Sequence, residues 1–280
     1  MRVLVTSERD SASLNMKQVF IDEYGFESTR ELFENNAIYE DSKGNKLITT
    51  KKDMIHCSHL SHYFDPEVFI FCSRHRSQSG KPALLVHSTG NFNDDTSFGG
   101  QPFSLSISAP SLVRQALIAL HRERNSKNLH EFDVTLEVTH HGPTELTRPV
   151  VFIELGSDEN FWNHKEGARA VVSAINACLK TPLDCSSVIG FGGTHYASKF
   201  NKLVLEREVT IGHILPKYAL DNINESVVRQ MIERCSCHVE NAVIDWKGTN
   251  ASQKEHLFPI LENLGVDVIR AKDIEKTKTP

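Results

Sequence analysis

Residues 132–145 read Phe-Asp-Val-Thr-Leu-Glu-Val-Thr-His-His-Gly-Pro-Thr-Glu, and this stretch indicates both a fold class and a site. Apolar residues alternate with polar ones from Phe132 to Val138, which is the pattern of a half-buried strand. Gly142-Pro143 then forces the chain to turn. His140 and His141 therefore stand at the end of a strand, where α/β sheets place catalytic and ligand-binding groups. The alternative is a pair of exposed, solvated histidines.

On either side of this stretch, strand-like and helix-like segments alternate. Strands are predicted at residues 3–6, 47–50, 67–72, 83–87, 150–155, 188–192, 208–213 and 242–246. Helices are predicted at residues 11–23, from 110 onward, at 159–179 and at 222–234, before a final helix–strand pair. Such alternation is typical of an α/β protein with helices packed on a mainly parallel or mixed sheet. We expect one domain over residues 1–280.

The composition excludes several classes of protein. A hydrophobic content of 39% and a charged content of 24% are ordinary globular values and argue against disorder or a fibrous repeat. The net charge of -5 argues against non-specific coating of nucleic acid, so any such contact should be confined to a local groove. No apolar stretch is long enough to span a bilayer. Six scattered cysteines without paired spacing predict reduced thiols and a cytoplasmic protein.

The segment between Gly90 and Pro110 is rich in Asn, Asp, Ser and Gly. A long polar loop within a compact domain is commonly a lid or a binding segment, and disorder is the alternative. We expect residues 90–110 to form a loop that faces the substrate.

Histidines recur at strand ends and in glycine-containing turns, the places where side chains from different strands converge. The members of this group are His75, His87, His140, His141 and His195. Imidazole is a good zinc ligand, and a hydrolytic zinc site combines about three protein ligands with an activated water. Glu145 and Glu154 are the nearest carboxylates that could act as ligand or base. No compact signature such as H-E-x-x-H shows which of these groups meet.

Two further motifs could bind an anionic substrate. Gly192 and Gly193 form a turn whose backbone amides could hold a phosphate or an oxyanion, the alternative being a tight turn beside a packed aromatic ring. Arg74 and Arg76 follow a strand, and their guanidinium groups suit phosphate recognition, the alternative being a solvated basic loop.

Taken in order, these motifs resemble the archaeal and plant type of D-aminoacyl-tRNA deacylase. The resemblance spans nearly the whole chain. Its landmarks are the opening strand 1–6, Ser73-Arg74-His75-Arg76-Ser77 with Gly80 and Pro82, His87 with Gly90-Asn91, residues 140–145, Glu154-Leu155-Gly156-Ser157 with Glu159 and Trp162, and residues 190–196 followed by Lys199-Phe200. Thr194 departs from the family, which often has a further glycine there, and should slightly stiffen the turn.

The resemblance implies a three-layer α/β/α fold with a mixed, mostly parallel sheet and a phosphorylase/hydrolase-like core. It implies a zinc enzyme that hydrolyses the ester between a D-amino acid and tRNA. The partner would be the acceptor end of D-aminoacyl-tRNA, bound by a monomer in the cytoplasm.

Within this resemblance the roles divide into three sets. The expected zinc ligands are His75, His87 and His140. The expected catalytic residues are His141, Glu145, Glu154 and His195. The expected contacts to substrate or tRNA are Arg74, Arg76, Gly192, Gly193, Tyr196 and Lys199. Two choices stay open: whether His140 or His141 faces the metal, and whether Glu145 or Glu154 handles the proton.

Two other functions fit the same residues. A zinc peptidase or amidohydrolase on the same scaffold would hydrolyse small peptides and ignore mischarged tRNA. A non-catalytic module for the tRNA end would use the histidines only as hydrogen-bonding groups.

Overall fold

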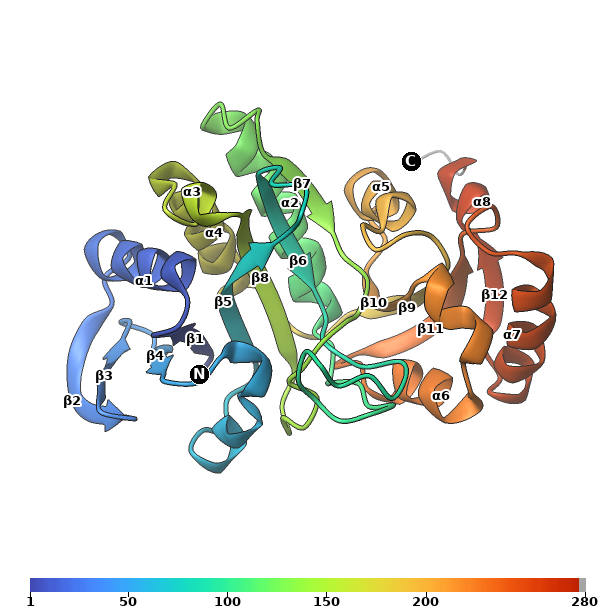
Figure 1. Cartoon of the computed structure of the whole chain (residues 1–280), viewed down its shortest axis with the longest axis horizontal. Helices are drawn as coiled ribbons and strands as arrows, with labels where there is room; N and C mark the ends of the chain where they lie inside the picture. The colour runs from blue at the N-terminus through green and yellow to red at the C-terminus, as the bar shows by residue number, and fades with distance from the viewer. Residues whose placement is uncertain (277–280) are drawn as a thin grey trace.

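The computed structural model describes residues 1–276 and contains two sheets that lie side by side (Figure 1). The strands of the larger sheet are, in spatial order, β2 (Glu27–Phe33), β3 (Asn36–Glu40), β4 (Lys46–Thr50), β1 (Val3–Ser7), β5 (Phe69–Arg76), β8 (Val150–Ser157), β6 (Ala83–His87) and β7 (Asp133–Leu136). Those of the smaller sheet are β10 (Ile211–Leu215), β9 (Ser186–Phe191), β11 (His238–Ile244) and β12 (Asp267–Arg270).

Most strand pairs are parallel, as predicted. In the larger sheet β2–β3, β3–β4 and β6–β8 are antiparallel and the other pairs are parallel. The smaller sheet is parallel throughout. The predicted mixed, mostly parallel α/β fold is therefore confirmed, with its strands divided between two sheets.

The larger sheet is buried on both faces. Helices α1 (Ser11–Glu23), α2 (Pro110–Ser126) and α4 (Lys165–Cys178) cover one face. The short 3-10 helices η1 (Met54–His56) and η2 (Ser58–His62) cover the other. Along β5, Ile70 and Cys72 face the helical layer, whereas Phe69 and Phe71 face η1 and η2. Burial on both faces explains why this strand reads as a continuous apolar run.

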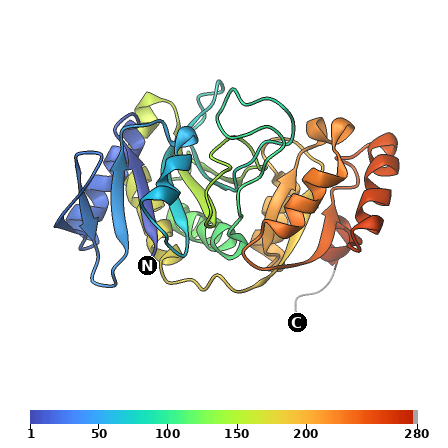
Figure 2. The same cartoon turned by 90° about the horizontal axis from the view of Figure 1, so that it is seen from below.

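The smaller sheet is also the middle of three layers. Helices α6 (Glu225–Glu233) and α7 (Ala251–Asn263) and the 3-10 helix η3 (Lys217–Asn222) lie on one face. Helices α5 (Ser198–Arg207) and α8 (Ala271–Lys276) lie on the other. Loop 88–109 stands between the half of the molecule that contains the larger sheet and the half that contains the smaller sheet (Figure 2).

The chain that follows β7 joins the two halves. The Val138 amide donates to the carbonyl of His195 (3.1 Å), and the Thr139 amide donates to that of Ile214 in β10 (3.0 Å). The predicted strand 132–138 is thus regular only up to Leu136, and its continuation hydrogen-bonds to the smaller-sheet half. This joint places the histidine pair at the junction of the two halves.

Several elements differ from the predicted ones. The β2–β3 hairpin was not predicted, because the residues of β2 are mostly polar and exposed and show no apolar alternation. The predicted helix 159–179 is two helices, α3 (Glu159–Trp162) and α4. Asn163 is the C-cap of α3, and His164 caps the start of α4 by accepting a hydrogen bond from the Gly167 amide (3.0 Å).

The prediction of six reduced thiols is also wrong. Cys185 and Cys237 form a disulfide, with 5.4 Å between their Cα atoms. They precede β9 and β11, whose first residues, Ser186 and His238, are paired in the sheet. Their separation in sequence hid this proximity. The other four cysteines are free.

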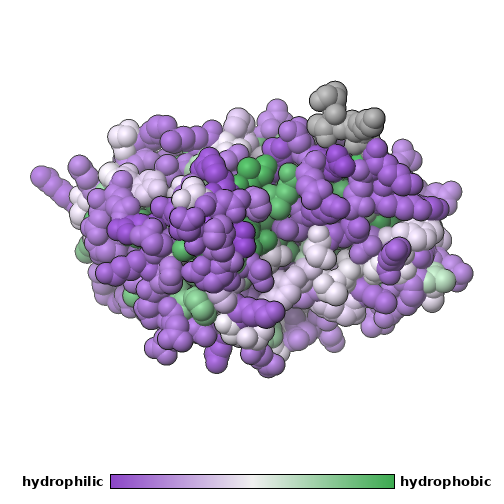
Figure 3. Space-filling view, turned by 90° about the horizontal axis from the view of Figure 1, so that it is seen from above, coloured by the Kyte–Doolittle hydropathy of each residue, from purple (hydrophilic) through white to green (hydrophobic). Residues whose placement is uncertain are grey.

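On the face shown in Figure 3, hydrophilic residues predominate and hydrophobic ones gather near the middle of the molecule. Within residues 1–276, no helix has both the length and the apolar character needed to cross a membrane.

Candidate metal and catalytic centre

The centre begins on the face of the larger sheet that lies under loop 88–109. Glu154, in β8, is paired with Ser73 of β5 on one side and with Leu85 of β6 on the other. His75 lies two residues after Ser73 in β5, and His87 lies two residues after Leu85 in β6. Both therefore share the face of Glu154. His75 Nδ1 is 3.3 Å from Glu154 Oε2, and His87 Nε2 is 3.6 Å from Glu154 Oε1.

Glu137 follows the last residue of β7 and is 1% exposed. Three histidines surround its carboxylate: His75 Nδ1 at 3.7 Å, His195 Nε2 at 3.3 Å and His140 Nε2 at 3.8 Å. Both of its oxygens are buried without a hydrogen-bond partner in the described structure. A buried carboxylate without compensation is strongly unfavourable, so these oxygens call for a cation or a proton donor.

Backbone carbonyl oxygens orient three of the histidines. Nδ1 of His87, His140 and His141 lies 3.1, 2.8 and 2.6 Å from the carbonyl oxygens of Ser88, Val138 and Gly142. Because a carbonyl only accepts hydrogen bonds, each Nδ1 carries the proton and each neutral ring keeps its Nε2 lone pair free. A ligating histidine is typically oriented in this way.

The surroundings of His140 and His141 favour neutral imidazole rings. Burial, and then the neighbouring His87, lower the pKa of His141 to about 3 and hold the pKa of His140 well below its usual value. For Glu154, burial acts to raise the pKa, but the contacts with His75 and His87 outweigh it and lower the pKa. The same contacts raise the pKa values of His75 and His87 against the effect of burial.

These groups fit a metal ion. Three overlapping sets bring their donor atoms within 4.8 Å of one another: His87, His140 and His141; Glu137, His140 and His195; and His75, Glu137 and Glu154. Imidazole nitrogens with one or two carboxylates are the donors that zinc prefers. The buried Nε2 of His87 lacks a hydrogen-bond partner among the described residues, as the oxygens of Glu137 do, which supports a cation at this position.

The cluster opens into a cleft of about 600 Å³ between the two halves. Its floor includes His75, His140, His141, Glu154 and His195. Met54, Ile55 and Phe98 line one side, and Tyr218 of η3 lines the cleft from the smaller-sheet half. Loop 88–109 contributes residues from Gly90 to Phe98 to the wall.

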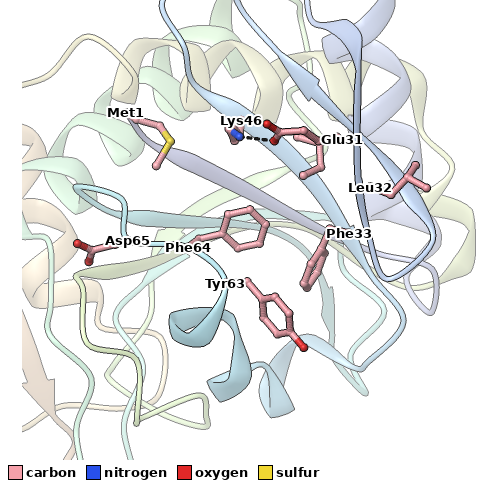
Figure 4. Close-up of a pocket in the computed structure, with 9 residues that line it drawn as sticks. Met1, Glu31, Leu32, Phe33, Lys46, Tyr63, Phe64 and Asp65 are labelled. Atoms are coloured by element: carbon pink, nitrogen blue, oxygen red, sulfur yellow. Dashed lines mark hydrogen bonds and ion pairs between the residues drawn. The ribbon is translucent and has the colours of Figure 1, made fainter.

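A second hollow, of about 480 Å³, lies beside the β2–β3 hairpin (Figure 4). The rings of Phe33, Tyr63 and Phe64 meet there edge to face. Its Lys46 pairs with Glu31 at 2.6 Å, and its Asp65 pairs with Arg148. With these charges already paired and no histidine among its described lining residues, it is not the candidate centre.

Comparisons with known proteins point to one family. The model of the D-aminoacyl-tRNA deacylase family matches residues 62–269. The D-aminoacyl-tRNA deacylase of Thermococcus onnurineus is 35% identical over 281 residues, covering 96% of this chain and all of the relative. That of Pyrococcus furiosus is 33% identical with the same coverage. The chain belongs to the D-aminoacyl-tRNA deacylase family.

A solved structure of a conserved protein of unknown function has the same fold, with a TM-score of 0.89 at 31% identity over 99% of this chain and 97% of that one. The family model and the relatives confirm the resemblance to the deacylase family that the motifs indicated.

In this deacylase-family chain, six of the predicted residues meet in one cluster: His75, His87, His140, His141, Glu154 and His195. Glu145 does not meet them. It is exposed and accepts hydrogen bonds from Ser58 Oγ (2.8 Å) and Gln101 Nε2 (3.0 Å). The Gly-Pro turn carries it out of the cleft, so the expectation of Glu145 as base or ligand is corrected.

Glu137 lies among the histidines instead, and the sequence patterns did not single it out. Its signal was an acidic residue on the polar side of the alternating run, three residues before the histidine pair. The apolar positions dominate the pattern of this strand, so a polar residue between them does not stand out.

The predicted anion-binding role of Gly192 and Gly193 is not supported by their amides. The Gly192 amide donates to the Leu215 carbonyl (2.8 Å), and the Gly193 amide donates to that of Gly248 (3.0 Å). Both have positive φ, and a Cβ on Gly192 would lie 2.3 Å from Thr249 Oγ1. These glycines build a close backbone crossing, which corrects the expectation that their N–H groups are free.

The remaining predicted contacts lie in different places. Arg74 and Arg76 line the cleft, and the guanidinium of Arg74 donates to the Arg9 carbonyl (2.8 Å). Tyr196 places its hydroxyl 3.3 Å from His75 Nε2. Lys199 lies outside the cleft lining and pairs with Glu275 of α8 at 3.1 Å, so its expected tRNA contact loses support.

Proposed function

We propose that this cleft hydrolyses the ester bond of D-aminoacyl-tRNA and releases the free D-amino acid and tRNA, with a zinc ion in the histidine cluster. The observation that carries the proposal is the buried Glu137 carboxylate, which lacks hydrogen bonds and faces three imidazoles. Membership of the deacylase family supports the choice of substrate.

The residues that would hold zinc are His87, His140 and His141. Their Nδ1 atoms are all tied to carbonyl oxygens, so the three Nε2 atoms are left as donors. A zinc ion bound there would polarise the ester carbonyl and lower the pKa of a water molecule to about 7. In this assignment both His140 and His141 bind the zinc ion. His75 is not a ligand and instead orients Glu154.

Proton transfer is assigned to Glu137 and His195. Glu137 accepts a proton from the attacking water while the water oxygen bonds to the ester carbon. The bond from that carbon to the ribose oxygen then breaks. The proton moves from Glu137 to His195 and from there to the departing oxygen. His195 Nε2 is 3.3 Å from Glu137 Oε1, and the side chain is 40% exposed, so it can reach both the buried base and the substrate.

The tRNA contact is confined to the acceptor end. The net charge of -5 does not favour a broad contact with nucleic acid, whereas Arg74 and Arg76 bring two guanidinium groups to the cleft. In this proposal the protein acts as a cytoplasmic monomer.

An assay with D-tyrosyl-tRNA, L-tyrosyl-tRNA and a small peptide tests the proposal. We expect rapid release of D-tyrosine, a much slower reaction of the L-ester and no peptide hydrolysis. Equal rates on the two esters would contradict chirality editing. Peptide hydrolysis alone would favour the peptidase alternative, and tRNA binding without turnover would favour the binding module.

A further inference from the structure

One wall of the cleft carries an aromatic ring to which the proposed hydrolytic step assigns no role. Tyr218, in η3, lines the cleft and is 63% exposed, although its hydroxyl is 3.3 Å from His195 Nδ1. The ring therefore stands one hydrogen bond away from the cluster with much of its surface free. A large exposed aromatic side chain beside a reaction centre is a candidate binding surface.

This wall is held rigidly. The Lys217 amide donates to the Gly193 carbonyl (3.0 Å), which ties η3 to the glycine turn. Gln253 of α7 donates through Nε2 to the Lys217 carbonyl (3.0 Å) and to Asp221 Oδ1 (2.9 Å). A surface fixed before binding loses little conformational entropy when a ligand arrives.

The η1 side of the cleft has a different chemistry. Met54, Ile55 and Phe98 line it and offer an apolar surface. The Gly142 amide donates to the Phe98 carbonyl (3.0 Å), so this surface lies next to His141, whereas Tyr218 contacts His195. The two surfaces thus approach the cluster through different histidines, one from the larger-sheet half and one from η3.

We propose that the ring of Tyr218 is the platform on which the terminal nucleobase of the tRNA stacks. An aminoacyl ester extends from its carbonyl carbon towards the amino-acid side chain in one direction and towards the nucleoside in the other. The apolar η1 surface suits the side chain, which leaves the flat tyrosine for the flat heterocycle. Stacking on an aromatic side chain is a common way to hold an unpaired base. This inference rests on the proposed function.

Three variants test the proposal on D-tyrosyl-tRNA. Tyr218→Ala should raise KM about ten- to hundredfold with a much smaller change in kcat, because a stacking contact is lost. Tyr218→Phe keeps the ring and loses the hydroxyl contact to His195, so its KM should stay close to that of the parent protein. Tyr63→Ala is the matched control, because Tyr63 is 66% exposed but lies in the hollow of Figure 4.

Equilibrium dialysis with adenosine gives a readout that does not depend on turnover, and ribose serves as the probe without a base. Adenosine should bind the parent protein and Tyr218→Phe more tightly than Tyr218→Ala, and more tightly than ribose binds. An unchanged KM in Tyr218→Ala, an equal rise of KM in Tyr218→Phe, or equal binding of adenosine and ribose would overturn the proposal. A parent protein that binds adenosine through Tyr218 without hydrolysing D-tyrosyl-tRNA would refute the proposed function and leave the base platform standing.

Discussion

Glu137 Oε1 and His195 Nε2 lie 3.3 Å apart, the first fully buried and the second on a side chain that reaches the cleft. The pair therefore links the interior of the cluster to the place where substrate enters. A carboxylate and an imidazole in this arrangement can move a proton between water and a leaving group.

Glu137→Gln should lower the single-turnover rate on D-tyrosyl-tRNA by about 10²- to 10⁴-fold, because the amide cannot accept the proton. The fold should survive, since the substitution removes a buried charge and keeps the volume. Glu145→Gln is the control, because Glu145 is exposed and hydrogen-bonds only to Ser58 and Gln101 among the described residues. Equal rates for the two variants would contradict the role of Glu137.

Stability should fall as the pH drops, in part through His213. This histidine is fully buried in β10, with Nε2 3.0 Å from the Arg234 carbonyl, and burial lowers its pKa to about 4. Its contribution to stability is complete above the unfolded pKa of about 6.5 and is lost as the pH falls towards the folded pKa. Between pH 7 and 5 the loss should be about 2 kcal/mol.

Urea unfolding of the parent protein and of His213→Gln at both pH values checks this. The difference in stability between the two proteins should shrink at pH 5. A constant difference would mean that His213 does not titrate in this range.

The disulfide should be detectable in solution. Thiol titration of the denatured, unreduced protein should count four thiols, because Cys185 and Cys237 are bonded. Cys237→Ser should lower the free energy of unfolding by about 3 to 4 kcal/mol, as expected when a loop with a sequence separation of 52 is no longer closed. Cys235→Ser, which keeps the bond, is the comparison. A count of six thiols would show that the bond does not form.

Local patterns predicted the elements of the site well. The apolar run ending at His87 placed that histidine correctly at the end of β6, whereas β7 ends at Leu136, four residues before His140. Their meeting with His75 depends on the order β5-β8-β6-β7, in which β6 runs antiparallel to β8 and brings His87 back towards Glu154. Strand order is set by contacts between distant segments, and no local pattern contains it.

The same limit explains the glycine turn. A turn at Gly192 and Gly193 was predicted correctly from the residues, and both have positive φ. Their amides are occupied by carbonyls of Leu215 and Gly248, which lie far along the chain. The residues alone could show that the backbone turns, but not which distant carbonyl groups accept its hydrogen bonds.

The most direct test of the zinc centre is to follow activity against bound zinc. Protein stripped with a chelator should lose deacylation of D-tyrosyl-tRNA, and activity should return in proportion to the zinc that binds. His140→Ala should stay folded yet neither bind zinc tightly nor recover, because His140 belongs to two of the three donor sets. Full deacylation by zinc-free protein, or by His140→Ala without zinc, would contradict a zinc-dependent centre.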